Sequence, residues 1–393
     1  MERSLRHYWT RADRGESIYR YVPFEITAGT RGVAVSINHS EGAVVDLGVF
    51  DPGGFRGYSG GARSRFAITA DAATPGYLPG ELTAGEWRVM LGLYIVPDGG
   101  VTVDISITTG DVRLAPTRPS PPPTERPPGR ELPAEAGRRW LGGDLHAHTV
   151  HSDGELTIEE LAHRAAGRGL DYLAVTDHNT VSHHPHLPAA QDRYGLRLIP
   201  GQEVTTHEGH ANALGEIPWV DFREPSDDWL QRVVSTGGLL SINHPLDLFC
   251  GWHRKFSGTA PLVETWHKTW DRIDIAPIDW CSDHGAVPVG GSDFHAPGDG
   301  DVLGAPTTFV EVEDEDVLGA LAEGRVAISS DPAGPVALRR GQDVVVVDGD
   351  ETTLLAPDGR PARVTSRLQT VGVSEEGLCR LVDPDGRTVA LVA

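Results

Sequence analysis

A proline-rich stretch between residues 116 and 133 limits what this chain can fold into. It holds eight prolines in eighteen positions, including the uninterrupted run at 121–123. Proline lacks a backbone N–H donor and fixes φ, so such a stretch cannot form a helix or a central strand. It favours an extended, semi-rigid segment instead. We therefore predict a linker at residues 114–139 that divides the chain of 393 residues.

The region before the linker is rich in short apolar runs. Between residues 21 and 109 these runs alternate with turn signals such as DPGG at 51–54 and PDGG at 97–100. Strands of this length, separated by glycine and proline turns and without helical periodicity, are typical of a β-sandwich. We predict such an accessory domain over residues 1–113.

After the linker, apolar strands alternate with helices. Thr157 and Glu160 form the pattern of a capping box that opens a helix through about residue 168, and a second helix is expected at residues 228–235. Strands are expected at residues 140–148, 170–175, 196–199, 239–242 and 287–289. This alternation predicts a parallel α/β sheet or barrel over residues 140–330. The turn signals in residues 331–393 predict a small β-rich C-terminal region.

Composition excludes several classes of protein. The 34 basic and 56 acidic residues give a formal net charge of -22, which repels a phosphate backbone and argues against binding of a nucleic-acid polymer. No run approaches the roughly 18 apolar residues of a membrane helix, and the first twenty residues are polar. We expect a soluble, cytoplasmic protein. The three cysteines lack any CxxC spacing, so neither a disulfide framework nor a zinc ribbon follows.

Histidines are crowded into one part of the chain. Fifteen of the 17 lie between residues 146 and 295, and histidine is the commonest metal ligand in proteins. In the DLHAHT segment, His146 and His148 are two residues apart, so on a strand they point to the same side and can grip one ion. Asp153 follows on a tight SDG turn and could fold back toward that ion, although alone it reads as a loop aspartate.

Two further strand ends carry paired or isolated polar groups. His178 in the TDHN segment is preceded by Asp177, which could be a ligand or could orient the histidine. Glu203 interrupts a strand pattern that otherwise looks buried. A buried carboxylate without a partner is costly, so a cation is the economical explanation.

The remaining candidates are His210 in GHAN, His244 in NHP, and Asp293 and His295 in GSDFH. Each could singly be a hydrogen-bonded polar residue of the core. Together, six clusters at strand ends favour a metal centre on one face of an α/β barrel. Imidazole and carboxylate ligands without thiolates suit zinc, manganese or iron.

The ordered set HxHT, SDG, TDHN, strand-end Glu, GH, NHP and GSDFH resembles the polymerase-and-histidinol-phosphatase (PHP) superfamily of metallohydrolases, and most closely its CehA/McbA-like branch. The resemblance covers about residues 140–325. It implies a distorted (β/α)7 barrel with two or three divalent metal ions in its mouth. The implied ligands of the first ion are His146, His148, Glu203 and Asp293, those of the second are Glu203, His210 and His244, and those of the third are Asp153, His178 and His295.

The resemblance also implies hydrolysis by a metal-bridging hydroxide, with Glu203, Asp293 and His295 as the catalytic residues. Because the ions would supply the nucleophile, no serine or cysteine nucleophile is required. We expect a phosphoesterase that acts on a small phosphoester. The same ions would polarise a carbonyl, so a carbamate or aryl-ester hydrolase is the enzymatic alternative. From another class, the chain could be a non-catalytic binding protein with a metal-stabilised scaffold.

The GWHRKF segment at residues 251–256 follows the His244 motif directly. Arg254 and Lys255 are candidates for recognition of a phosphate or carboxylate group of the substrate, and a solvated loop is the alternative. The predicted set leaves out His207, His253, His267 and His284, among other histidines, because they match no ligand position of the family. The sequence carries no indication of an oligomeric state.

Overall fold

A computed structural model of the chain describes residues 2–258, 261–267, 275–298, 300 and 302–393. It divides into two compact units. The first comprises Met1–Pro119 together with the short segments Val150–Asp153 and Asp177–Pro185, and the second comprises the rest. None of the helices within the described residues combines the length and the apolar character needed to cross a membrane.

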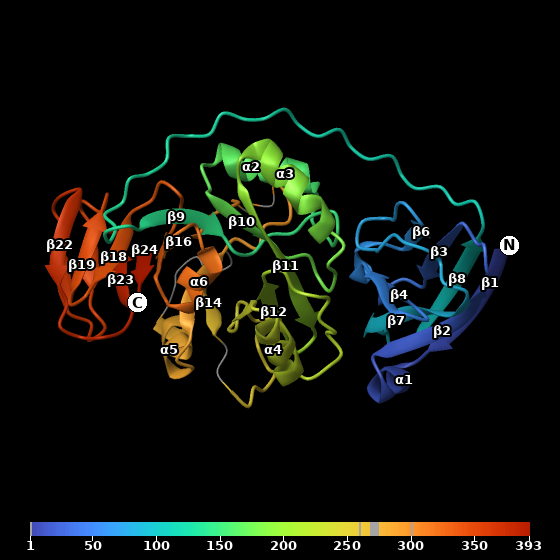
Figure 1. The fold of residues 1–393 in the computed structure, drawn as a ribbon. Helices are drawn as coiled ribbons and strands as arrows, with labels where there is room; N and C mark the ends of the chain where they lie inside the picture. The colour runs from blue at the N-terminus through green and yellow to red at the C-terminus, as the bar shows by residue number, and fades with distance from the viewer. Residues whose placement is uncertain (1, 259–260, 268–274, 299, 301) are drawn as a thin grey trace. The chain divides into compact units, whose positions relative to one another are not determined.

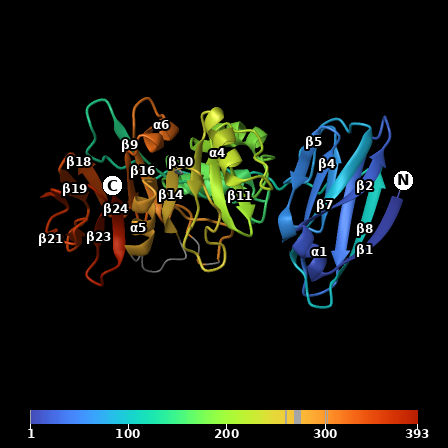
Figure 2. The same cartoon turned by 90° about the horizontal axis from the view of Figure 1, so that it is seen from below.

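The first unit contains two antiparallel sheets of four strands each (Figure 1 and Figure 2). One sheet has the order β1 (Glu2–Trp9), β8 (Val101–Thr109), β3 (Gly32–His39) and β6 (Arg65–Thr69). The other has the order β2 (Tyr19–Ile26), β7 (Gly85–Ile95), β4 (Val44–Asp51) and β5 (Gly54–Tyr58). A short helix of six residues, α1 (Arg11–Glu16), connects β1 to β2.

Alternation along the strands builds the core of this unit. In β8, Val101, Val103, Ile105 and Ile107 are buried and the residues between them are not, as expected for a strand with one face on a core. They join residues of both sheets, including the fully buried Trp87, in one hydrophobic cluster. The two sheets therefore share one core through their inner faces.

The second unit is organised by one sheet of thirteen strands. Its first seven strands are, in spatial order, β15 (Val287–Gly291), β14 (Leu262–His267), β13 (Leu239–Ile242), β12 (Gly209–Leu214), β11 (Arg197–Thr206), β10 (Tyr172–Val175) and β9 (Arg139–Asp144). The next six are β16 (Thr307–Val312), β17 (Val326–Ser329), β24 (Thr388–Val392), β23 (Cys379–Val382), β20 (Thr353–Leu355) and β21 (Pro361–Arg363). The mixed α/β class predicted from the sequence is confirmed.

Strands β9, β10 and β11 are parallel, as are β13, β14 and β15, and antiparallel β12 joins the two groups. The helices of this unit are α2 (Ile158–Gly167), α3 (Leu187–Tyr194), α4 (Ser226–Ser235), α5 (Ile275–Asp283) and α6 (Val317–Ala322). Helix α2 begins where the sequence predicts, because Thr157 and Glu160 form a complete capping box.

The closed barrel predicted from the family resemblance is not seen among the described strands. Both edges of β16 are occupied by antiparallel partners, β9 on one side and β17 on the other. No edge of β16 is left for a ladder to β15. The hydroxyl of Thr308 bridges the two strands instead, since it donates to the carbonyl of Gly290 at 2.8 Å and accepts from its N–H at 2.9 Å. The sheet is therefore open and continues into the C-terminal strands.

A three-stranded sheet, β18 (Val336–Arg340), β19 (Asp343–Val347) and β22 (Leu368–Gly372), completes the C-terminal region. Its apolar residues cluster with those of β20, β23 and β24. This region is β-rich, but β24 and β23 extend the main sheet of the unit.

Residues 114–138 contain no helix or strand, in keeping with their prolines. From Pro121 onward the segment is held by the second unit. Tyr194 donates its hydroxyl hydrogen to the carbonyl of Pro121 at 2.8 Å, and Arg126 donates to the carbonyl of Leu170 at 2.7 Å. Figure 1 shows this extended run passing α2 and α3. Over this part of its length, the linker is held by hydrogen bonds to residues of the second unit.

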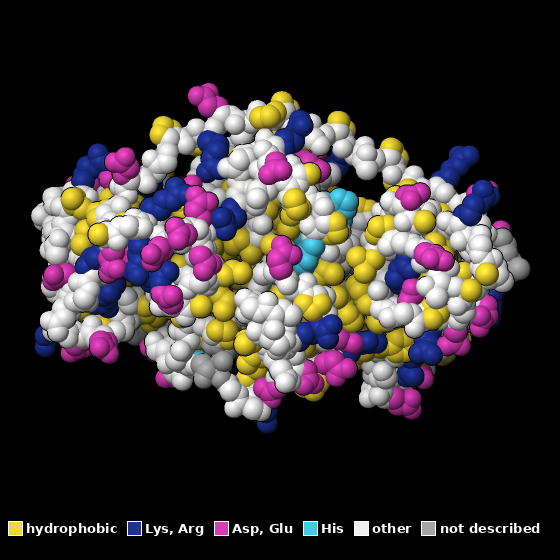
Figure 3. Space-filling model, viewed as in Figure 1, with side chains coloured by type: hydrophobic (Ala, Val, Ile, Leu, Met, Phe, Trp, Pro, Cys, Tyr) yellow, Lys and Arg dark blue, Asp and Glu magenta, His cyan; other side chains and the backbone are white. Residues whose placement is uncertain are grey.

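On the face drawn in Figure 3, acidic and basic side chains alternate, and no large area of one sign is seen. On this face the charge pattern gives no extended basic groove of the kind that follows a nucleic-acid backbone.

Candidate metal centre

Four predicted ligands of the second unit meet in what we call the central cluster: His146, His148, Glu203 and Asp293. The two histidines follow β9, Glu203 lies in β11, and Asp293 follows β15. Their ligand atoms all lie within 4.8 Å of one another. Nε2 of His148 is 2.9 Å from Asp293 Oδ1, and Nε2 of His146 is 3.1 Å from the same oxygen. Glu203 faces both rings, at 3.4 Å from His146 and 3.5 Å from His148. Strand ends that are far apart in sequence therefore bring nitrogen and oxygen donors to one point.

Glu203 also joins the central cluster to a second group. Its Oε1 atom is 3.1 Å from His210 Nδ1 and 3.6 Å from His244 Nε2. Asn243 donates its side-chain N–H to the same oxygen at 2.8 Å. The Glu203 carboxylate thus lies between His146 and His148 on one side and His210 and His244 on the other. A ligand shared by two ions would have this position.

The donor atoms fit a divalent cation. His146, His148 and Glu203 are completely buried, and Nε2 of His146 makes no hydrogen bond within the described part of the chain although it lies 3.1 Å from a carboxylate oxygen. Buried polar atoms are almost always satisfied, so an orphaned imidazole nitrogen aimed at carboxylates indicates a missing partner. A cation accepts lone pairs from both kinds of donor.

In the absence of a cation, protonated imidazole balances the negative charge of the carboxylates. Burial by itself would lower the pKa of His146, but the carboxylates of Asp293, Glu203 and Glu264 outweigh it and raise that pKa to about 10. Burial would raise the pKa of Asp293, yet the imidazoles of His146 and His148 hold it well below its ordinary range. The cluster is therefore built to balance negative carboxylates with positive charge.

Strand β14 contributes two residues that the sequence reasoning missed. Glu264 is 2% exposed, with Oε1 at 3.1 Å from His146 Nδ1 and Oε2 accepting the backbone N–H of His244 at 2.8 Å. His267, which matches no ligand position of the family, lies with Nε2 at 3.3 Å from Asp293 Oδ2. A signal was available, because Glu264 interrupts an apolar run just as Glu203 does.

Two candidate ligands adopt backbone conformations that favour glycine. His244 has φ of 28° and Asp293 has φ of 47°. Left-handed conformations at non-glycine residues are uncommon and cluster at functional sites, where surrounding contacts hold them. Gly291, the first residue of the GSDFH segment, is required for close approach: a Cβ there would lie 2.5 Å from His146 Cβ and 2.6 Å from Glu264 Oε1.

Asp153 and His178 belong to segments of the first unit, where His178 Nε2 is 3.5 Å from Asp153 Oδ1. Asp177 accepts the hydroxyl hydrogen of Ser152 at 2.7 Å and lies 3.3 Å from His183 Nδ1. The 150–153 segment is also held by Arg63, which donates to the carbonyl of Ser152 at 2.7 Å and to that of Val150.

His295 belongs to the second unit. Its Nδ1 is 2.8 Å from the carbonyl oxygen of Asp293, and its ring stacks on His148 with the centroids 4.2 Å apart. The third ion, whose predicted ligands come from both units, stays a prediction.

The two predicted substrate-binding residues have different environments. Arg254 donates to the carbonyl of Glu224 at 2.8 Å, lies 3.4 Å from the Glu208 carboxylate and covers the ring of Trp229 at 4.3 Å. These contacts tie its guanidinium to neighbouring loops and to α4. Lys255 is exposed. Their role in binding substrate stays a prediction.

Cys250 is half-buried beside the second group, with Sγ at 3.4 Å from His244 Nδ1. Burial raises the pKa of this thiol, against the opposing effect of His244. His210, His244 and Cys250 have ligand atoms that all lie within 4.8 Å of one another. Cys281 and Cys379 are buried free thiols.

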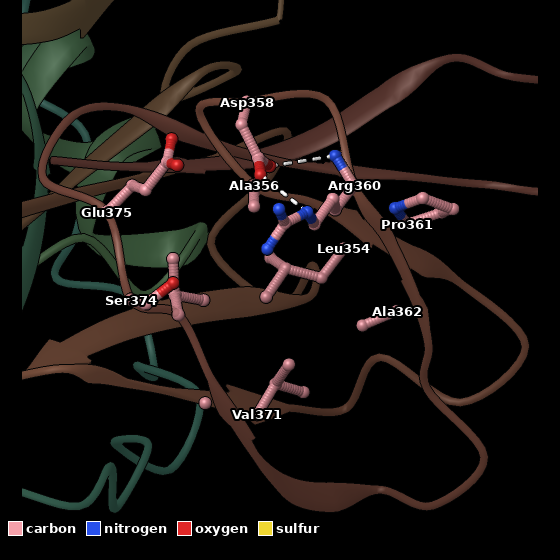
Figure 4. A pocket seen from close by; sticks show the side chains of 11 residues that line it. Leu354, Ala356, Asp358, Arg360, Pro361, Ala362, Val371, Ser374 and Glu375 are labelled. Atoms are coloured by element: carbon pink, nitrogen blue, oxygen red, sulfur yellow. Dashed lines mark hydrogen bonds and ion pairs between the residues drawn. The ribbon is translucent and has the colours of Figure 1, made fainter.

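A separate cavity of about 230 Å³ lies in the C-terminal region, between the β20–β21 hairpin and the end of β22 (Figure 4). Its polar lining includes the ion pair between Asp358 and Arg360, whose atoms approach to 2.8 Å. None of its eleven lining residues is a histidine. Among the described residues, the groups of side chains that could hold a metal ion lie elsewhere, in the segments discussed above.

Residues 144–256 match the PHP domain model. The matched stretch contains His146, His148, Glu203, His210 and His244, and it ends before Asp293. This stretch is thus similar to the PHP domain, in agreement with the family resemblance of the sequence. The comparisons do not distinguish the CehA/McbA-like branch.

Several curated proteins are similar to part of the chain. The 5'-3' exoribonuclease Rnm of Salmonella typhimurium is 42% identical over 89 residues, which cover 21% of this chain and 29% of that protein. A phosphoribosyl 1,2-cyclic phosphate 1,2-diphosphodiesterase of Eggerthella lenta is 35% identical over 123 residues, or 27% of this chain and 47% of that protein. A 3',5'-nucleoside bisphosphate phosphatase of Chromobacterium violaceum is 38% identical over 87 residues, or 21% and 29%. The chain spans less than half the length of each.

Among solved structures, a two-domain protein of Bacteroides vulgatus, described as containing a predicted PHP-like metal-dependent phosphoesterase, superposes with a TM-score of 0.45. The two are 18% identical, and the superposition covers 69% of this chain and 99% of the other.

Proposed function

We propose that the chain is a metal-dependent hydrolase of the PHP type, from its CehA/McbA-like branch, and that it cleaves a small phosphoester. The observation that carries the proposal is the convergence of four donor side chains in the central cluster, three of them completely buried. A buried, multi-carboxylate centre of this kind is costly to maintain without a cation. A non-catalytic scaffold would have no need of a carboxylate shared between two sets of histidines.

In this proposal His146, His148, Glu203 and Asp293 hold one ion, and Glu203 with His210 and His244 holds a second. Asp153, His178 and His295 hold a third. Bound divalent ions of zinc, manganese or iron would supply an activated water and would stabilise negative charge on the substrate.

The chain's own residues set up this chemistry by fixing which atoms face the centre. A carbonyl oxygen can only accept, so the contact with the Asp293 carbonyl places a proton on Nδ1 of His295. Nε2 of His295 is then the basic nitrogen, available to an ion or to a proton that passes to the leaving oxygen. Asp293 holds its Oδ1 toward His146 and His148, so its carboxylate adds the negative charge that a cation needs.

The names of similar proteins support phosphoesters as the substrate class. The names of three similar proteins are those of an exoribonuclease, a cyclic phosphate diesterase and a bisphosphate phosphatase. The net charge of -22 favours small substrates over long polyanions. Carbamates and aryl esters, whose carbonyl could be polarised by the same ions, are the alternative substrate class to be tested.

The test is a substrate panel with the metal-loaded protein: nitrophenyl phosphate, a bis-nitrophenyl phosphodiester and an aryl carbamate. We expect turnover of a phosphoester that Glu203→Gln abolishes. Glu311→Gln is the matched control, because Glu311 is equally a buried carboxylate of this unit but accepts hydrogen bonds from Glu135 and Arg340. Phosphoester turnover no faster than that of the metal in buffer would refute the substrate class.

A further inference from the structure

We infer that Glu264 is a positioning residue of the metal centre, which fixes both the ring of His146 and the backbone of His244. The inference rests on the proposed function, since it concerns how the ligands of that centre are held. Glu264 belongs to β14, a strand that carries none of the ligands implied by the family resemblance.

The geometry gives each carboxylate oxygen of Glu264 one partner. Oε1 lies 3.1 Å from His146 Nδ1, and Oε2 accepts the backbone N–H of His244 at 2.8 Å. The side chain is 2% exposed, so water does not compete for these contacts. One carboxylate therefore ties a ligand of the first proposed ion to a ligand of the second.

The contact with His146 decides which ring nitrogen carries a hydrogen. An ionised carboxylate only accepts hydrogen bonds, so Nδ1 of His146 is the donor. In the neutral ring the lone pair is then on Nε2, the atom that faces Asp293 and Glu203. Carboxylate–histidine pairs of this kind set the tautomer and the orientation of metal-binding imidazoles.

The hydrogen bond from the His244 N–H to Glu264 holds His244 in an unfavourable backbone conformation. His244 has φ of 28°, a region that a non-glycine residue occupies only when its surroundings fix it. Its N–H is fixed by Glu264, and its side chain reaches Glu203. The missing side chain of Gly291 leaves the space in which the Glu264 carboxylate and His146 meet.

The informative variant is Glu264→Gln, which keeps the size of the side chain but presents one acceptor and one donor. If the amide oxygen accepts from His244, the amide N–H₂ faces His146 Nδ1. That nitrogen must then carry the lone pair, and the hydrogen moves to Nε2, where the ion would bind.

The experiment measures the dissociation constant of the tightest-binding Zn²⁺ by chelator competition, together with the melting temperature of the metal-free protein. We expect Glu264→Gln to bind Zn²⁺ about 10- to 100-fold more weakly than the wild type. Glu264→Asp, which keeps both acceptors, should fall between the two. Glu311→Gln should bind as the wild type does. In the Zn²⁺-loaded wild type, nitrogen NMR should show the hydrogen of His146 on Nδ1.

The outcomes separate this inference from the proposed function. Wild-type protein that binds no Zn²⁺ would refute both. A Zn²⁺-binding wild type with an unchanged constant in Glu264→Gln, or with the His146 hydrogen on Nε2, would refute the positioning role alone. If Glu264→Gln does not fold, the constant for Glu264→Asp and the NMR result decide the question.

Discussion

Metal binding at the central cluster should release protons and should tighten as pH rises. In the metal-free protein the surrounding carboxylates raise the pKa of His146 to about 10, and the pKa of His244 is also raised well above its ordinary value, by Cys250 and Glu203 against the effect of burial. His146 is then protonated at pH 7.5. A coordinating nitrogen must give up its proton, so an ion displaces at least one.

The magnitude follows from the number of protons displaced. Each proton makes the apparent affinity rise about tenfold per pH unit below the raised pKa. Between pH 6.5 and 8.5 we expect the dissociation constant for Zn²⁺ to fall by about 100-fold for one proton. A histidine with an ordinary pKa of about 6.5 would give almost no change over this range.

Calorimetric titration in buffers of different ionisation enthalpy counts the protons directly. We expect one to two protons released per ion at pH 7.5. An affinity that does not change between pH 6.5 and 8.5, with no proton release, would refute the electrostatic account of the cluster.

The raised pKa of His146 also makes the stability of the metal-free protein depend on pH. A raised folded-state pKa stabilises below the unfolded value of about 6.5, and this contribution is lost as pH rises toward 10. The free energy of unfolding of the metal-free protein should therefore fall across this window, by an amount on the order of 4 kcal/mol for His146. Urea unfolding at several pH values measures it.

Three substitutions test the local structure. Gly291→Ala would place a methyl group 2.5 Å from His146 Cβ; we expect a loss of about 1–3 kcal/mol in the free energy of unfolding and less bound Zn²⁺. Thr157→Ala removes the N-cap of α2 and should cost about 1 kcal/mol in urea unfolding at unchanged metal content. The Arg367 guanidinium lowers the pKa of Asp348, so Asp348→Asn should cost at most about 1 kcal/mol at pH 7, and the difference from wild type should vanish as pH falls below about 3.8. A constant difference down to pH 2.5 would contradict that origin.

Much of the site could be predicted because its polar residues stand at the ends of apolar strands. His146, His148, Glu203 and Asp293 follow or interrupt such runs, and the structure brings their donor atoms together. The capping box at Thr157 marks the start of α2 for the same local reason. Local patterns of this kind can be recognised in a sequence without any knowledge of tertiary contacts.

Other features depend on contacts that a single sequence does not display. Strand β14 is only six residues long, and the partners of Glu264 lie in the segments that follow β9 and β13. The open sheet results from the pairing of β16 with both β9 and β17, which the strand periodicity does not specify. The charge of Arg254 and its place after the His244 motif predict a role in substrate binding, whereas its neighbours Glu224 and Trp229 are known only from the fold.

The most direct test of the metal centre is the metal content of the protein after loading with excess Zn²⁺ or Mn²⁺ and desalting. The account predicts two or three equivalents in the wild type and in Glu311→Gln, and the loss of at least one equivalent in Glu203→Gln, because Glu203 lies between both groups of imidazoles. A folded wild-type protein that retains no divalent ion, or a Glu203→Gln variant that retains all of them, would contradict it.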